Sequence, residues 1–217
     1  MIISHEHEIY RRKRPTTASR WNGAYYYSVE ILRNIIPRVK TDRSWITINI
    51  PEAGAVDGAI VFIHNNKQPD IYNWLKRYND LILVCGVPDT VEKVAHIGKA
   101  IYLPLSVDLK DVRRHKGNKT RDTAFIGREA KKRGYTFPQG TDIISNMPRE
   151  RLLDEMARYK QVYAVGRTAI EARVLGCDIL PYDERYPDVY LWQPFDNKHA
   201  AALLQEKLDG IDGGPHK

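Results

Sequence analysis

Residues 161–183, QVYAVGRTAIEARVLGCDILPYD, carry the residue types that a phosphate- and sugar-binding site needs. A Gly166-Arg167-Thr168 turn follows a short apolar run and opens a helical segment. Backbone N–H groups at a helix N-terminus bind anions, and Arg167 and Thr168 add a cation and a hydroxyl. Glu171 lies one turn inside the helix, where its carboxylate reaches a ribose beside the bound phosphate or, alternatively, faces solvent. The stretch predicts half of a nucleotide-sugar site.

Two further arginines and an aspartate are candidates for the same site. Arg128 ends the strand-like run that begins at Thr123, and Arg133 follows five residues later. Arginine makes bidentate phosphate contacts and keeps its charge, so both side chains are predicted to face one diphosphate. The alternative for Arg128 is a surface ion pair. Asp183 follows the apolar strand at 178–180 and is a candidate for holding sugar hydroxyls.

A histidine in the first half of the chain is the candidate catalytic base. His64 follows the apolar run Ala59–Ile63, and ligands of parallel sheets bind outside the carboxyl ends of strands. The alternative is a loop histidine that caps the next turn. His5 and His7 would share one face of a strand, but two ligands do not make a metal site. The sequence therefore predicts a general base and no metal.

The charge balance allows an acidic partner. Among 217 residues, 34 are Lys or Arg and 27 are Asp or Glu, which leaves a net charge of +7. Such an excess suits nucleic acid, an anionic lipid surface or a diphosphate substrate, although solvated loops also gather cations. The excess is concentrated in three clusters, at 11–14, 113–121 and 131–133.

Cysteine usage and hydropathy indicate the compartment. Cys85 and Cys177 each lie in or beside an apolar strand, where a free thiol behaves as a small hydrophobe in a reducing environment. No apolar run approaches the ~20 residues that span a bilayer, and the N-terminus lacks a signal-peptide pattern. We expect a cytoplasmic protein with no membrane span.

Strand and helix patterns alternate throughout the chain, which predicts an α/β protein with parallel sheets and crossover helices. A basic, Gly- and Asn-containing stretch at 104–119 separates two halves. We predict two Rossmann-like domains, 1–104 and 105–217, with the last helix packing back on the first. Expected strands are 45–50, 59–63, 80–85, 99–103, 123–126, 162–165, 178–180 and 188–192; expected helices are 24–39, 69–78, 90–96, 148–158, 169–175 and 197–208.

Several segments resemble the GT-B glycosyltransferases, in order along almost the whole chain. The segment 101–108, IYLPLSVD, resembles their interdomain linker V-I-P-N-G-V-D, and FIGR at 125–128 is similar to their strand that ends in Gly-Arg. Arg133-Gly134 falls where that family has Lys-Gly. The segment 168–177, TAIEARVLGC, resembles their L-E-A-M-A-x-G motif, and WNGA at 21–24 resembles the Gly-rich loop that opens the acceptor domain.

This resemblance implies two Rossmann-like halves facing across a cleft and a nucleotide diphosphate sugar, such as a UDP-sugar, as donor. Arg128 and Arg133 would bind the diphosphate and Glu171 the ribose. Metal would not be required, because protein cations and the helix dipole neutralise the leaving group. The acceptor is open, and the basic charge makes a modified base in DNA one candidate.

Three departures from the family pattern leave other functions open. Retaining members carry a second carboxylate eight residues before Glu171, where this chain has Tyr163. Arg133 replaces a lysine, and the chain is shorter than typical members. The leading hypothesis is a metal-independent hexosyl- or pentosyltransferase. The alternatives are a non-catalytic nucleotide or nucleic-acid binding module and, less favoured, a nucleotide-sugar epimerase.

Overall fold

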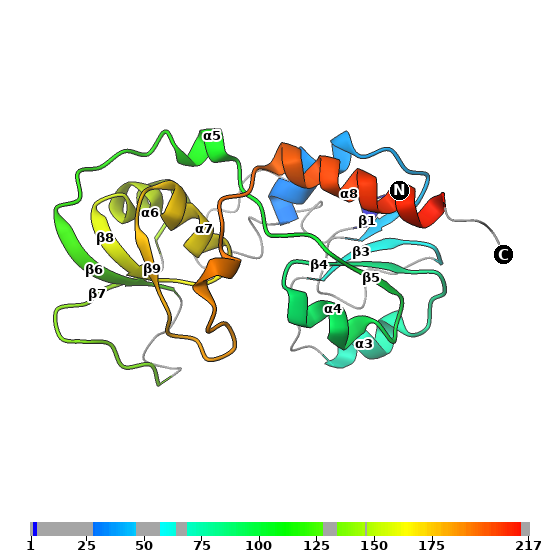
Figure 1. Ribbon diagram of the computed structural model, residues 1–217, viewed down its shortest axis with the longest axis horizontal. Coiled ribbons are helices and arrows are strands. Elements are labelled where there is room, and N and C mark those ends of the chain that lie inside the picture. Colours follow the sequence, from blue (N-terminus) through cyan, green and yellow to red (C-terminus); the bar gives the residue numbers. More distant parts are fainter. Residues whose placement is uncertain are drawn as a thin grey trace. The chain divides into compact units, whose positions relative to one another are not determined.

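The computed structural model describes residues 2–3, 28–46, 57–63, 69–127, 134–145 and 147–213. His64, Arg128 and Arg133 lie outside the described residues. The chain divides into two compact units. Of the described residues, the first unit contains those up to 105 together with 197–213, and the second contains those from 106 to 196 (Figure 1).

The first unit is built on a five-stranded parallel sheet in which each strand lies beside the strand that precedes it in the chain. The central strands are unbroken apolar runs, as expected for strands buried on both faces. Trp74, Leu75 and Val94 of the helices α3 and α4 pack into one core with the sheet. The elements are β1 (Ile2–Ile3), β2 (Trp45–Ile46), β3 (Ile60–Ile63), α3 (Pro69–Leu75), β4 (Ile82–Cys85), α4 (Pro88–Val94) and β5 (Lys99–Tyr102).

The C-terminal helix α8 (Asn197–Asp212) belongs to the first unit, although the second unit precedes it in the chain. It packs on the short helices η2 (Ile31–Ile35) and η3 (Ile36–Arg38), and it buries Leu204 and Leu208. Gln205 of α8 accepts from the Lys40 backbone N–H at 2.6 Å and donates to its carbonyl at 3.1 Å. Within the described residues, no helix has both the length and the hydropathy to cross a membrane.

The second unit is a four-stranded parallel sheet in the order β7-β6-β8-β9. Figure 1 shows α6 and α7 together on one face of it. Leu153 and Met156 of α6, and Ala169 and Ile170 of α7, are buried there. The elements are α5 (Leu109–Val112), β6 (Arg121–Ile126), β7 (Asp142–Ile144), α6 (Arg149–Met156), β8 (Tyr159–Tyr163), α7 (Arg167–Val174), β9 (Asp178–Leu180) and η6 (Val189–Leu191).

The predicted α/β class with parallel sheets is confirmed. The predicted strand at 188–192 is wrong, because η6 is a 3-10 turn. The Asp188 carboxylate accepts the Tyr190 backbone N–H at 2.8 Å, a local bond that closes a turn instead of a strand. The stretch predicted as a linker contains α5, whose N-cap Asp108 accepts from the Asp111 N–H at 2.9 Å.

We predict that both cysteines are unreactive in the native protein. Cys85 is fully buried, and burial raises its pKa to about 12. Burial also raises the pKa of Cys177, despite the nearby Lys119 ammonium group. At about pH 8 both thiols are therefore neutral and shielded from reagents. Iodoacetamide should alkylate them only in molecules that unfold. Because one cysteine lies in each unit, mass spectrometry of the labelled peptides should give a separate urea unfolding curve for each.

An accessible thiol introduced by Ala202→Cys, on the exposed side of α8, provides the reference rate. If either natural cysteine reacts as fast as this reference in native buffer, the prediction is wrong.

Candidate functional site

The strand order of the second sheet indicates that a ligand would bind at the carboxyl ends of β6 and β8. The chain runs from β6 outward to β7 and then returns past β6 to β8. In open parallel sheets, ligands bind outside the carboxyl ends of the strands at such a reversal. Gly127 follows β6 there, and Gly166 precedes α7 at the end of β8. Two of the sequence-predicted segments thus stand at the ends of neighbouring strands.

The backbone geometry explains both glycines. A Cβ atom on Gly127 would lie 2.7 Å from a ring carbon of Phe125, so no larger residue fits without a shift of that ring. Gly166 has φ 63° and ψ −140°, a conformation open to glycine alone. This turn delivers the chain from β8 directly into α7.

The N-terminus of α7 offers unused hydrogen-bond donors. Gly166 provides no side-chain cap, and the first helical bond is from the Ile170 N–H to the Gly166 carbonyl at 3.2 Å. The N–H groups of Thr168 and Ala169 donate to no group within the described residues. Ala169 is fully buried, whereas Thr168 is half-buried, so the Thr168 N–H is the more accessible of the two to a ligand. Donors of this kind, with the helix dipole behind them, suit an anionic ligand.

Glu171 is the centre of a buried network of charges. It is 4% exposed, and its Oε1 accepts from Arg167 Nε at 3.0 Å and from Arg149 Nε at 3.1 Å. Arg149 also donates to Asp111 Oδ2 at 2.8 Å. The network joins the first residues of α6 and α7 to α5, so it fixes where these helices begin.

The network favours the charged form of Arg149. Burial alone would lower the pKa of the Arg149 guanidinium, but Glu171 and Asp111 outweigh this and raise it above its ordinary value. Two cations and two carboxylates leave these four side chains neutral overall. The second oxygen of Glu171, Oε2, accepts no hydrogen bond from the part of the chain that the structure describes. Glu171 therefore retains one oxygen for a hydroxyl or amine donor.

Asp183 follows β9 and is 2% exposed. Its carboxylate accepts from Arg185 Nε at 2.7 Å and from the Arg185 backbone N–H at 3.1 Å. The hydrogen bond with Asp183 also raises the pKa of Arg185, although burial opposes it. Asp183 is thus engaged with a neighbouring cation, and its predicted contact with sugar hydroxyls stays a prediction.

Aromatic side chains gather at the same end of the second sheet. Phe125 and Tyr163 are register partners on β6 and β8. Phe137 lies against both, with ring centroids 4.5 Å from Phe125 and 5.0 Å from Tyr163, and Tyr182 lies 5.2 Å from Phe125. The half-buried Tyr163 therefore contributes its ring to an aromatic cluster.

The structure brings together Gly166, Arg167, Thr168 and Glu171 at one helix start. Sequence reasoning missed Arg149, although the chain carries a signal for it. An arginine in the first position of a helix meets the positive end of the helix dipole, which disfavours a cation. Its presence there indicates a carboxylate partner from elsewhere in the fold.

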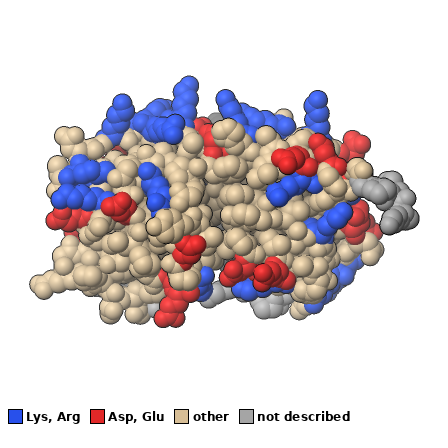
Figure 2. Space-filling view, in the orientation of Figure 1, with Lys and Arg blue, Asp and Glu red and all other residues tan. Residues whose placement is uncertain are grey.

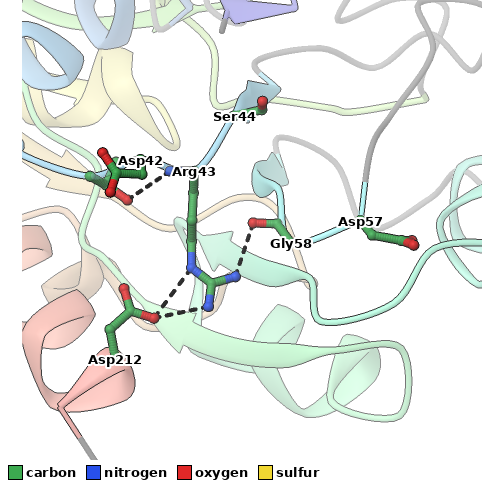
Figure 3. Close-up of a pocket in the computed structure, with 7 residues that line it drawn as sticks. Asp42, Arg43, Ser44, Asp57, Gly58 and Asp212 are labelled. Atoms are coloured by element: carbon green, nitrogen blue, oxygen red, sulfur yellow. Dashed lines mark hydrogen bonds and ion pairs between the residues drawn. The ribbon is translucent and has the colours of Figure 1, made fainter.

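A hollow of about 590 Å³ opens on the first unit, at residues that precede strands. Figure 3 shows Arg43 at its centre, directed at Asp212 and the Gly58 carbonyl. Arg43 also binds Asp80 at 2.8 Å and Asp212 at 2.9 Å. The hollow lies at the amino ends of β2 and β3. Parallel sheets bind ligands at the opposite, carboxyl ends of their strands. Its arginine serves to tie the end of α8 to the sheet.

No protein-family model matches the chain, and no curated protein matches it.

We predict that Glu171→Ala destabilises the protein by about 3–5 kcal/mol, because it leaves Arg149 and Arg167 buried without their shared carboxylate. Urea denaturation measures the loss. The matched control is Glu150→Ala on α6, whose side chain is 68% exposed and whose loss should cost below about 1 kcal/mol. Equal losses for the two variants would contradict a central role of Glu171 in the network.

We also predict that Asp111 contributes to acid sensitivity. Burial favours its neutral form, but hydrogen bonds and charge from Arg149 and Arg114 outweigh this and hold its pKa below 3.8. Its contribution to stability is complete above that ordinary value and is lost as the pH falls through the folded-state pKa. The unfolding free energy of the natural protein should therefore exceed that of Asp111→Asn by an amount that shrinks on acidification.

Urea unfolding at a series of pH values from about 6 downwards measures this difference. Asp178→Asn, at an exposed position, is the matched control for the same change in side chain. A difference that stays constant down to the acid transition would refute the prediction.

Proposed function

We propose that the protein is a glycosyltransferase that uses a nucleotide diphosphate sugar, with the donor bound at the N-terminus of α7. The observation that carries the proposal is the pairing of uncapped N–H donors at Thr168 and Ala169 with Glu171 one turn further along the helix. This pairing stands at the strand-order reversal of a parallel sheet. A diphosphate on the N–H groups would leave a ribose within reach of the free Glu171 oxygen.

The proposal includes a GT-B arrangement with an acceptor-side and a donor-side domain. Two Rossmann-like sheets and a C-terminal helix that belongs to the first unit support it. So does the order in which the GT-B-like segments follow one another along the chain.

In the transfer, the bond between the sugar C1 and the diphosphate oxygen breaks, and a bond from an acceptor hydroxyl oxygen to C1 forms. The nucleoside diphosphate leaves with the negative charge, which the α7 N-terminus stabilises. Arg128 and Arg133, the cations predicted from the sequence, would add to this stabilisation. The acceptor proton passes to a base within hydrogen-bond reach, for which His64 is the sequence candidate.

A non-catalytic nucleotide-binding module is the second candidate function. It is favoured by Tyr163, which replaces a carboxylate, and by the burial of Glu171 between two arginines. A module of this class would bind a nucleotide at the same helix start and release it unchanged.

Incubation with a panel of nucleotide diphosphate sugars tests the proposal. We expect slow hydrolysis of one member to sugar and nucleoside diphosphate, because water replaces an absent acceptor. Thr168→Val should weaken calorimetric binding of that nucleotide about tenfold, since it removes a hydroxyl beside the charged diphosphate without changing the side-chain shape.

Thr120→Val, at an exposed position of the same unit, should leave the affinity unchanged. Binding without hydrolysis of any donor would favour the module, and interconversion of the sugar on its nucleotide would favour an epimerase. If no nucleotide binds, both leading proposals fail.

A further inference from the structure

The segment that contains α5 carries cations that the fold does not use. Lys110, Arg113 and Lys116 are exposed, and their side chains form no hydrogen bond or ion pair with any described residue. We call these three residues the basic surface. The two carboxylates of the segment are engaged elsewhere: Asp108 caps α5, and Asp111 binds Arg149 and Arg114.

The fold holds the basic surface in place through its neighbours. His115 Nδ1 lies 2.7 Å from Asp154 Oδ1 of α6. The backbone at Gly117 runs so close to Ala157 that an added Cβ would lie 3.1 Å from the Ala157 carbonyl. With the Asp108 cap, the segment is anchored at both ends and in its middle. The cations are therefore held near one another before any partner binds, which lowers the entropic cost of binding.

Two of the three cations lie on one side of a helical turn. Lys110 and Arg113 are three residues apart, a separation that makes side chains neighbours on a helical turn. Like charges at this spacing repel one another, and no carboxylate within the described residues relieves them. Figure 2 shows lysine and arginine side chains projecting from the edge of the second unit that carries α5.

We propose that the basic surface binds the phosphate backbone of a polynucleotide. Phosphates that repeat along a backbone suit several cations carried by one segment, and the exposed Asn118 next in the chain supplies a further donor for phosphate and sugar oxygens. A lipid surface fits less well, because the segment exposes no large apolar side chain that would insert among acyl chains.

Polynucleotide binding by the basic surface requires neither the α7 site nor the proposed transferase activity. If the activity is absent, the surface still makes the protein a polynucleotide-binding module.

Fluorescence anisotropy of a short labelled DNA duplex of random sequence, without any nucleotide sugar, tests the proposal on the full chain. The triple variant Lys110→Glu/Arg113→Glu/Lys116→Glu should bind at least about tenfold more weakly at low salt. The slope of log affinity against log salt should fall by about 2 to 3, because three phosphate contacts no longer release counterions.

The matched control is Arg77→Glu/Lys93→Glu/Lys99→Glu in the first unit, which makes the same change in net charge at exposed positions. It should bind nearly as well as the natural protein. Thermal unfolding checks that each variant is folded, and the triple glutamine substitution at 110, 113 and 116 replaces the first variant if it is not.

Three results would overturn the proposal. The natural protein fails to bind the duplex at low salt, or both triple variants lose the same affinity, which would leave only a net-charge effect. The third result is that the protein sediments with vesicles of phosphatidylcholine and phosphatidylserine, that this sedimentation requires Lys110, Arg113 and Lys116, and that the duplex does not bind. It would identify a membrane as the partner.

Discussion

Two buried guanidinium groups share one carboxylate oxygen in the second unit, and the local geometry depends on that contact. Arg149 and Arg167 are the first residues of α6 and α7, and each approaches Glu171 Oε1 to within about 3.1 Å. Each arginine meets the positive end of a helix dipole, which disfavours a cation there. The shared carboxylate offsets this cost and thereby holds the start of α7, where the candidate anion site lies.

The same contact defines what Glu171 has available for a ligand. A carboxylate with one oxygen bound by two cations keeps a fixed orientation, as a site that recognises hydroxyl groups would require. In the proposed site, Glu171 would serve structure and recognition together. If a Glu171 variant fails to bind a ligand, the result can be interpreted only together with a measurement of its folding.

The lysine and arginine side chains named above fall into two classes. Arg43, Arg149 and Arg167 are directed inward and bind carboxylates or carbonyls of the fold. Lys110, Arg113 and Lys116 are directed outward and are bound by no described residue. Net charge alone does not distinguish these classes; the distinction comes from which cations have a carboxylate within reach.

The sequence by itself determined the α/β class, the strands with unbroken apolar runs and the turn at Gly166, because each is recorded in neighbouring residues. Only the tertiary structure decided the strand order, which brings the ends of β6 and β8 together. It also decided the hydrogen-bond partners of Glu171. Arg149 is 22 residues from Glu171 and 38 from Asp111 in the chain, so no local pattern relates them. Residues 188–192 illustrate the opposite case, where a local Asp188 hydrogen bond prevailed over strand-like hydrophobicity. Periodicity specifies which face of an element is buried, whereas the ion pairs that position a site depend on distances that exist only after the elements have packed.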